Sequence, residues 1–221
     1  QESDLTNLQR PDTRVIDCEG KALLPGFVDA HLHLMAYAST LLAVECSQDT
    51  VNSISDIRDA LAHRAATTPQ GGWIRAFGYH DALLEERRHP TRYDLDKASA
   101  NHPIRLNHIS GHATVLNSMA LQAVGIGLDT PDPVYGVIDR DEATGEPTGV
   151  LFEMEEFLEE RIPALSWDEL TEGIRQANQR FLSVGITSIH DASPGNSLER
   201  WATLLSLRRE GIIDPWLYFM P

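Results

Sequence analysis

The stretch from Pro25 to His33, PGFVDAHLH, constrains the fold of this chain more than any other. Its Pro-Gly pair ends the preceding segment, and the short apolar run that follows is typical of a buried strand. His31 and His33 lie two positions apart at the end of that run. Side chains i and i+2 of a strand point to the same face, so the spacing presents two imidazoles together. Two such imidazoles could supply two of the ligands of a metal site.

The His-x-His spacing alone does not establish a metal site. The chain has 9 histidines in 221 residues, so chance produces such a pair at an appreciable rate. The structural alternative is two polar residues that close a strand. Imidazole is nevertheless the commonest metal ligand and suits zinc, and a strand end holds two of them rigidly. The wider sequence is needed to choose between these interpretations.

Several stretches together resemble a known family. Residues 20–34 resemble the first-strand signature of the metal-dependent amidohydrolase superfamily, and later stretches resemble its YtcJ-like branch, amidohydrolase family 3. These later stretches are Gly78–Asp81, Pro90–Asp96, His108–His112, Asn117–Leu121, Thr148–Glu153 and Gly185–Asp191. Their order and spacing match from end to end of the chain, which is more specific than any single motif.

The resemblance implies an α/β fold built on part of a (β/α)8 TIM barrel, about its first three strands, with an α+β insertion. We expect residues 1–24 to be the remnant of an N-terminal β-sandwich domain and residues 25–70 to be the first βα unit. Residues 71–165 would form the insertion, and residues 166–221 a barrel helix, strand two, a helix and strand three. Family members are two or more times as long as this chain, so we expect a fragment.

Local patterns predict the individual elements. Ser53 is a candidate helix N-cap, and Ser166 opens a capping box before an apolar helical face that ends at Gly185. The turn Glu19-Gly20 predicts two short strands at 14–17 and 21–24. Further predicted strands are 73–78, 103–108, 136–138, 150–152, 186–190 and 216–220, and further predicted helices are 117–124, 154–161 and 198–209.

Active sites of such barrels lie at the C-terminal ends of the strands. The resemblance therefore implies that His31 and His33 are metal ligands. Glu153 is a further candidate ligand, and its alternative role is that of an acid in the first turn of the following helix. The implied substrate pocket contains Tyr79, His80, His108, His112, His190 and Asp191.

Structural roles remain open for several of these residues. Hydrogen bonding within a loop is the alternative for His108 and His112, and strand-end packing is the alternative for His190. The remaining histidines have surface contexts, and we expect them to be solvated: His63, His89 and His102.

The implied reaction is metal-assisted hydrolysis of a C–N bond in a small-molecule amide other than a peptide, or of a related ester. One or two divalent ions, zinc by expectation, would activate a water molecule. The general-base Asp and the other ligands are expected beyond Pro221, so we expect this chain alone to be inactive and its metal to be weakly held or absent. The alternatives are a non-catalytic binding or interaction fragment, and an esterase, lactonase or deaminase of the superfamily.

Composition narrows the possible partners and location. The net charge of −15, from 33 acidic and 18 basic residues, provides no basic surface for nucleic acid. The longest apolar stretch, around residues 34–44, is too short for a membrane span. Cys18 and Cys46 form no zinc or disulfide pattern and favour a cytoplasmic location. An open barrel exposes strand edges, so we expect an oligomer or association with the missing C-terminal portion.

Overall fold

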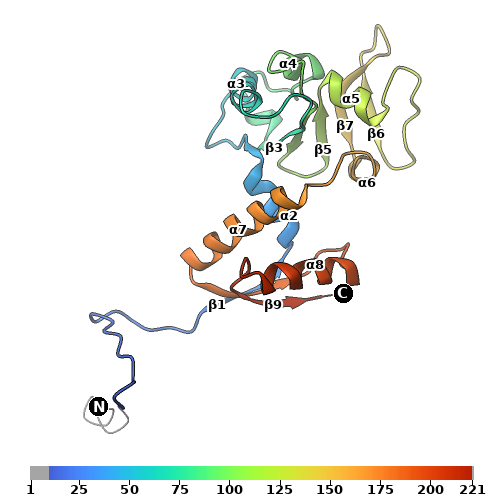
Figure 1. Cartoon of the computed structure of the whole chain (residues 1–221). Helices are drawn as coiled ribbons and strands as arrows, with labels where there is room; N and C mark the ends of the chain where they lie inside the picture. The colour runs from blue at the N-terminus through green and yellow to red at the C-terminus, as the bar shows by residue number, and fades with distance from the viewer. Residues whose placement is uncertain (1–9, 221) are drawn as a thin grey trace.

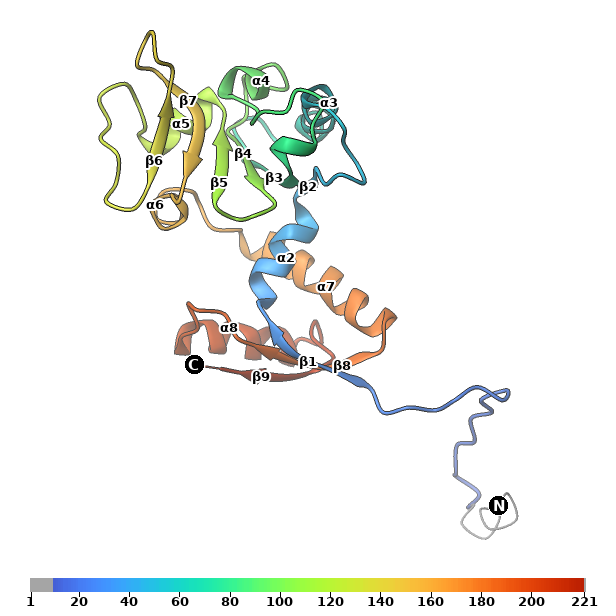
Figure 2. The same cartoon turned by 180° about the vertical axis from the view of Figure 1, so that it is seen from behind.

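The computed structural model describes residues 10–220, whose strands form two separate sheets (Figures 1 and 2). The smaller sheet is parallel throughout and has the order β1-β8-β9, with β1 at Phe27–Leu32, β8 at Ile186–Asp191 and β9 at Trp216–Phe219. The larger sheet has the order β2-β3-β4-β5-β7-β6. Its strands are β2 (Val44–Glu45), β3 (Ile74–Tyr79), β4 (Ile104–His108), β5 (Ala113–Leu116), β6 (Val137–Arg140) and β7 (Pro147–Phe152).

Each sheet has its own helices. Helices α2 (Leu34–Leu42) and α7 (Trp167–Ser183) lie side by side between the two sheets, and α8 (Leu198–Arg209) packs on the small sheet (Figure 1). The six-stranded sheet carries α3 (Ile54–Ala65), η2 (Asp81–Leu83), α4 (Arg92–Asp96), α5 (Ser118–Val124) and α6 (Glu155–Glu159).

Helix boundaries follow the local signals in the sequence. The Ser53 side chain accepts a hydrogen bond from the Asp56 backbone N–H, and the Asp56 carboxylate accepts one in return. Ser166 and Glu169 form the same reciprocal capping box at the start of α7. These bonds satisfy backbone N–H groups that a helix start leaves unpaired. Both predicted helix starts are thus confirmed.

The core of the small sheet depends on close contact between α2 and α7. A Cβ at Gly173 would lie 2.7 Å from the Ala38 carbonyl oxygen, so only glycine allows this approach of the two helices. Tyr37 and Phe181 stack beside it with ring centroids 5.6 Å apart. The buried side chains of this core are Leu34, Ala38, Ile174, Ala177, Phe181, Ile189, Leu204, Leu207 and Ile213.

Asn117 ties α5 to the middle of the six-stranded sheet. Its side-chain oxygen accepts hydrogen bonds from the backbone N–H groups of Ile104 and Ala120, each at 2.9 Å. Its amide nitrogen donates to the carbonyl oxygens of His102 and Ser99. The residue is fully buried, and all of these bonds satisfy groups that would otherwise be buried unpaired.

The predicted strands at 14–17 and 21–24 do not form, so this prediction is wrong. The turn between them does form, with Glu19 and Gly20 both in the left-handed region. Val15, Ile16 and Leu23 are 68%, 70% and 86% exposed. An isolated two-stranded hairpin gains too little burial to be stable, and no strand in residues 10–220 pairs with this segment.

The grouping of residues 25–70 as one βα unit differs from the observed packing. Strand β2 pairs in parallel with β3 of the six-stranded sheet. Helix α3 contributes Ile54, Ile57 and Leu61 to a core shared with Ile74 and Leu106 of that sheet. The chain therefore enters the six-stranded sheet at Val44, well before residue 71. Of the β-sandwich remnant expected at residues 1–24, residues 10–24 form no strand, and residues 1–9 lie outside the described residues.

The α/β class is confirmed, and the three parallel strands with helices between them have the predicted order. The closed barrel of a longer protein stays a prediction. Within residues 10–220, no helix has both the length and the apolar composition needed to cross a membrane.

Candidate functional site

His31 and His33 lie together at the C-terminal end of β1. Both side chains are exposed, and their rings meet edge to face with centroids 5.2 Å apart. The pairing of β1 with β8 shifts register between Asp29 and Leu32, so β1 carries one extra residue before Leu32 pairs with Asp191. Such a bulge re-aims the side chains that follow it. The predicted pair therefore exists as two adjacent, accessible imidazoles.

The glycine before β1 permits the close approach of β1 and β8. A Cβ at Gly26 would lie 2.0 Å from the Thr187 hydroxyl oxygen, and the next backbone N–H, from Phe27, donates to the Gly185 carbonyl oxygen at 2.8 Å. The Pro-Gly pair in the sequence thus has a packing role as well as ending the preceding segment.

Asp191 forms a hydrogen bond to the backbone of Leu34, the residue that follows His33. It is fully buried, and its carboxylate accepts hydrogen bonds from the backbone N–H groups of Leu34 at 3.2 Å and Ser193 at 2.9 Å. The Asn196 side chain donates to the same carboxylate at 3.3 Å. Asp191 therefore links the end of β8 to the start of α2. Its predicted place in the substrate pocket stays a prediction.

His190 occupies the neighbouring strand end. It pairs in register with Tyr218 of β9, and the two rings lie 4.6 Å apart. Because β1 and β8 are parallel neighbours, His31, His33 and His190 all stand at one end of the small sheet.

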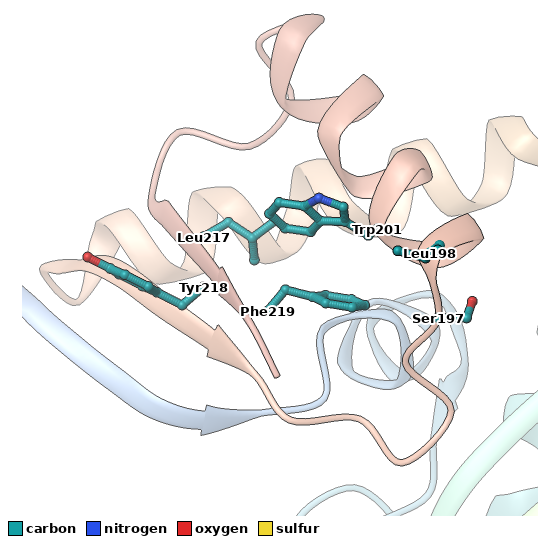
Figure 3. A pocket seen from close by; sticks show the side chains of 6 residues that line it. All are labelled: Ser197, Leu198, Trp201, Leu217, Tyr218 and Phe219. Atoms are coloured by element: carbon teal, nitrogen blue, oxygen red, sulfur yellow. The ribbon is translucent and has the colours of Figure 1, made fainter. Parts of the chain in front are cut away.

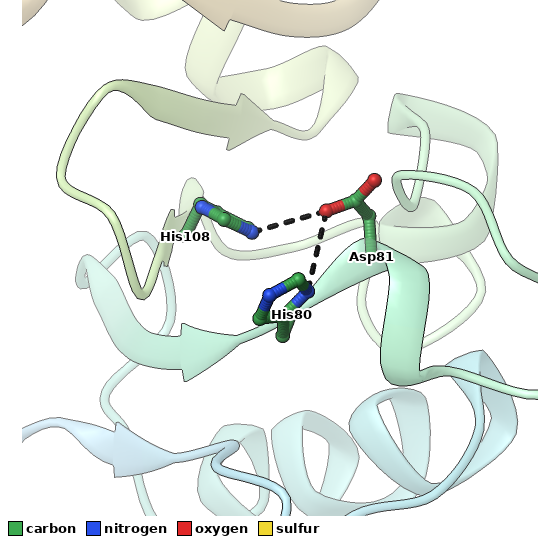
Figure 4. A group of neighbouring side chains, drawn as sticks. All are labelled: His80, Asp81 and His108. Carbon is green, nitrogen blue, oxygen red and sulfur yellow. Dashed lines mark hydrogen bonds and ion pairs between the residues drawn. The ribbon is translucent and has the colours of Figure 1, made fainter.

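A second group of polar side chains lies at the same end of β3 and β4 in the six-stranded sheet (Figure 4). Its members are His80, Asp81 and His108. The Asp81 Oδ1 atom is 3.1 Å from His108 Nε2 and 3.6 Å from His80 Nδ1. These ligand atoms all lie within 4.8 Å of one another. The structure thus gathers two of the predicted pocket residues around a carboxylate.

His89 joins this group, and the prediction that it is solvated is wrong. Its Nδ1 atom lies 2.8 Å from the Tyr79 hydroxyl, and its Nε2 atom lies 3.8 Å from Asp81 Oδ2. His89 comes from the loop before α4, and no local pattern signals its approach to β3. Tyr79 itself is fully buried.

His102 is buried, which contradicts the predicted surface position. Its ring nitrogens lie 2.8 Å from the Ser99 hydroxyl oxygen and 3.1 Å from the Thr68 carbonyl oxygen. It connects the loops that contain Ser99 and Thr68. His63 is exposed, as predicted.

Burial and neighbouring rings set the charges of this group. Burial, together with the nearby His89 and His80, lowers the pKa of His108, although the Asp81 carboxylate opposes the shift. Partial burial acts to raise the pKa of Asp81, but His89, a backbone hydrogen bond and His108 outweigh it and lower that pKa. Asp81 is therefore ionised and His108 neutral near pH 7.

The neutral His108 ring has a definite proton position. The Ser110 backbone N–H points at Nδ1 from 3.1 Å, so Nδ1 accepts and the proton sits on Nε2. The Nε2–H group then donates to Asp81.

Glu153 contacts His112 in the structure. The His112 Nδ1 atom lies 2.9 Å from Glu153 Oε1, and both side chains are largely exposed. The Glu153 backbone is in the left-handed region at φ 52, and its N–H donates to the His112 carbonyl oxygen. The pair closes the adjacent ends of β5 and β7. Its predicted ligand and pocket roles stay predictions.

A hollow of about 550 Å³ lies between α8 and β9 (Figure 3). Its walls are mainly apolar and include Trp201, Leu217 and Phe219. The Trp201 and Phe219 rings are 5.1 Å apart. Among the described residues, no histidine or carboxylate lines the hollow, so it is separate from both groups of candidate ligands.

Comparison with known proteins identifies the family. The model of the amidohydrolase family matches residues 14–215, nearly the whole chain. The chain belongs to the amidohydrolase family. This amidohydrolase is 35% identical over 196 residues to the N-substituted formamide deformylase of Arthrobacter pascens, covering 86% of the chain and 36% of that protein. It is also 35% identical to the putative amidohydrolase YtcJ of Bacillus subtilis strain 168, covering 81% of the chain and 34% of that protein.

Solved structures support the same fold for this amidohydrolase chain. An uncharacterized metal-dependent hydrolase from Pyrococcus horikoshii OT3 superposes with a TM-score of 0.69 at 23% identity, covering 99% of the chain and 40% of that protein. A second, from Pyrococcus furiosus, gives 0.62 at 26% identity, covering 88% of the chain and 37% of that protein. The chain thus spans about a third of the length of the curated relatives that it matches.

Proposed function

We propose that this chain is the N-terminal portion of a metal-dependent hydrolase that cleaves C–N bonds in small non-peptide amides, with His31 and His33 as metal ligands. The observation that carries the proposal is the adjacent, accessible imidazole pair at the C-terminal end of β1. The family match and the named activity of the A. pascens relative support the choice of reaction.

The chemistry of the donor set fits a divalent ion. Neither imidazole ring forms a hydrogen bond within residues 10–220, so nitrogen lone pairs are available to a metal. Zn²⁺ binds imidazole nitrogen readily, and we propose zinc as the ion. When bound, such an ion acts as a Lewis acid and activates a water molecule for attack on an amide carbonyl.

The protein supplies position and shape around that ion. The hydrogen bond from the Leu34 N–H to Asp191 anchors the backbone immediately after His33, which limits the movement of both ligands. We propose that His190, whose ring lies beside that of Tyr218 on the next strand, contacts a substrate at the same sheet end. Rigid placement of ligands and substrate contacts lowers the entropy loss on reaching the transition state.

The pair supplies only part of a catalytic zinc site, which takes three protein ligands and a water molecule. We propose that the remaining ligands and the general base come from further strands of the longer protein. Phe27, Val28, Trp216 and Tyr218 leave both edges of the small sheet with exposed apolar side chains. Additional barrel strands would cover them, and the hollow beside Trp201 would receive a following helix.

The isolated chain is accordingly proposed to be inactive and to associate with that C-terminal portion or with itself. Cys18 and Cys46 are both free thiols, which supports a proposed location in the reducing cytoplasm.

The test uses the full-length protein together with the 221-residue chain. Purified protein is assayed against N-substituted formamides, other amides and esters, and its metal content is measured by elemental analysis. We expect the full-length protein to hydrolyse amides and the chelator-treated protein to lose activity. The His31→Asn/His33→Asn variant should lose turnover together with the metal that this histidine pair holds.

His63→Gln is the matched control, because His63 is exposed on α3. It should retain metal and turnover. Full activity and metal content in the His31→Asn/His33→Asn variant would contradict the proposal. Hydrolysis of esters alone would replace the amide reaction with an esterase, and specific ligand binding without turnover would favour a binding fragment.

A further inference from the structure

We propose that His80, Asp81 and His108 form a second divalent-metal site, suited to Zn²⁺, on the six-stranded sheet (Figure 4). These residues come from the ends of β3 and β4, whereas His31 and His33 belong to the small sheet. The second site therefore exists or fails independently of the hydrolase centre.

The spacing of the ligand atoms approaches that of a tetrahedral zinc site. Zinc bonds of 2.0 to 2.2 Å place neighbouring ligand atoms about 3.4 Å apart. The Asp81 Oδ1 atom lies 3.1 Å from His108 Nε2 and 3.6 Å from His80 Nδ1. The two histidine nitrogens lie within 4.8 Å of each other. Rotation of the His80 ring toward His108 would shorten the distance between the two histidine nitrogens.

His80 Nδ1 lacks a partner that a metal would supply. The atom is buried and has no hydrogen-bond partner within residues 10–220, since Asp81 at 3.6 Å is too far away for a hydrogen bond. A buried polar atom without a partner is unfavourable. A metal ion bound between His80, Asp81 and His108 would give His80 Nδ1 a bonding partner.

Neighbouring side chains can orient the ligands. The Ser110 hydroxyl oxygen lies 2.8 Å from His108 Nδ1 and can accept a hydrogen bond from the Nδ1–H group when Nε2 binds the metal. The Ser110 N–H must then turn away from the ring. Such outer hydrogen bonds are usual around metal-binding histidines.

His89 approaches the second oxygen of Asp81. Its Nε2 atom is 3.8 Å from Oδ2, while its Nδ1 atom is held 2.8 Å from the Tyr79 hydroxyl. We therefore assign His89 to orienting the carboxylate, and a water molecule to the fourth position of the ion.

Zinc titration of the 221-residue chain tests this site. The His31→Asn/His33→Asn variant lacks the proposed hydrolase ligands and serves as the background. After chelator treatment, calorimetric titration with ZnCl2 measures how many zinc ions this variant binds. We expect one Zn²⁺ per chain in this background. His80→Gln should weaken its binding at least tenfold, and His108→Gln should abolish it, whereas the exposed control His63→Gln should leave it unchanged.

Titration with Co²⁺ gives a second readout, since a tetrahedral nitrogen and oxygen site produces strong visible absorption. This absorption band should appear with the His31→Asn/His33→Asn chain and disappear when His80→Gln is added to it. Circular dichroism checks folding. If His108→Gln does not fold, His80→Gln decides the matter, because its ring makes no hydrogen bond and is 40% exposed. Absence of zinc binding in the background, or equal affinity in His80→Gln and His63→Gln, would overturn the proposal.

Discussion

The buried carboxylate of Asp191 accepts a hydrogen bond at 3.2 Å from the backbone N–H of Leu34, 157 positions earlier in the chain. This bond joins the end of β8 to the first residue of α2, directly after His33. Asp191 is a predicted substrate-pocket residue because it lies at a strand end. The structure shows in addition that Asp191 is hydrogen-bonded to the backbone next to the proposed metal ligands.

Replacing Asp191 should weaken both the fold and the metal site. Asp191→Asn places an amide NH2 among N–H donors, so we expect a loss of about 2 kcal/mol in the free energy of unfolding, the usual range for hydrogen bonds to a charged group. Zinc affinity at His31 and His33 should fall with it. Urea denaturation and zinc titration measure the two effects. Asp59→Asn, on the exposed side of α3, is the control, and equal stability of the two variants would refute the anchoring role.

The contact between α2 and α7 should not tolerate a side chain at Gly173. A Cβ there would lie 2.7 Å from the Ala38 carbonyl oxygen, so Gly173→Ala must separate the helices. Overpacking of this kind destabilises by about 1 to 3 kcal/mol, which offsets the gain in helix propensity from alanine. We expect a lower melting temperature by circular dichroism. Gly127→Ala, where nothing lies within 4 Å, is the matched control and should melt like the parent chain.

Ionisation of Asp94 should make the free energy of unfolding depend on pH. Burial acts to raise the pKa of this carboxyl, but hydrogen bonds from Arg88 and Thr91 outweigh it and hold the pKa below its ordinary value of 3.8. A lowered folded-state pKa stabilises the protein above the unfolded pKa, and this contribution is lost as pH falls through the folded value. We therefore expect the free energy of unfolding to decline below about pH 4.

The Asp94→Asn variant isolates that contribution. It should be less stable than the parent chain at pH 7, and the difference should shrink as the pH is lowered toward 2. Chemical denaturation at a series of pH values provides the measurement. A stability difference that stays constant over this range would show that ionisation of Asp94 is not responsible.

The open edge of the small sheet should cause self-association. Trp216 and Tyr218 of β9 are exposed apolar residues on an edge strand, and such edges pair with other chains. We expect the isolated chain to elute as an oligomer in size-exclusion chromatography with light scattering. Replacing both residues with lysine should shift it toward monomer. Trp167→Lys on α7 is an exposed control, and a monomeric parent chain would contradict this prediction.

Local signals account for the elements that were predicted correctly. Ser53 and Ser166 identify helix starts because a capping bond involves residues only three positions apart. Gly125 ends α5 in the left-handed conformation that glycine adopts most easily. His31 and His33 are only two positions apart at the end of β1, so their closeness follows from local spacing, whereas the bulge before Leu32 depends on pairing with β8.

The sequence by itself determined the family, the α/β class, most helix and strand positions and the His31–His33 pair. Only the tertiary structure decided that β2 and α3 join the six-stranded sheet, that 14–17 and 21–24 remain without strand partners, and that His89 and Tyr79 meet around Asp81. These outcomes depend on contacts between residues distant in the chain. Burial and strand pairing are properties of the assembled surfaces, and no local spacing of residue types specifies which surfaces meet.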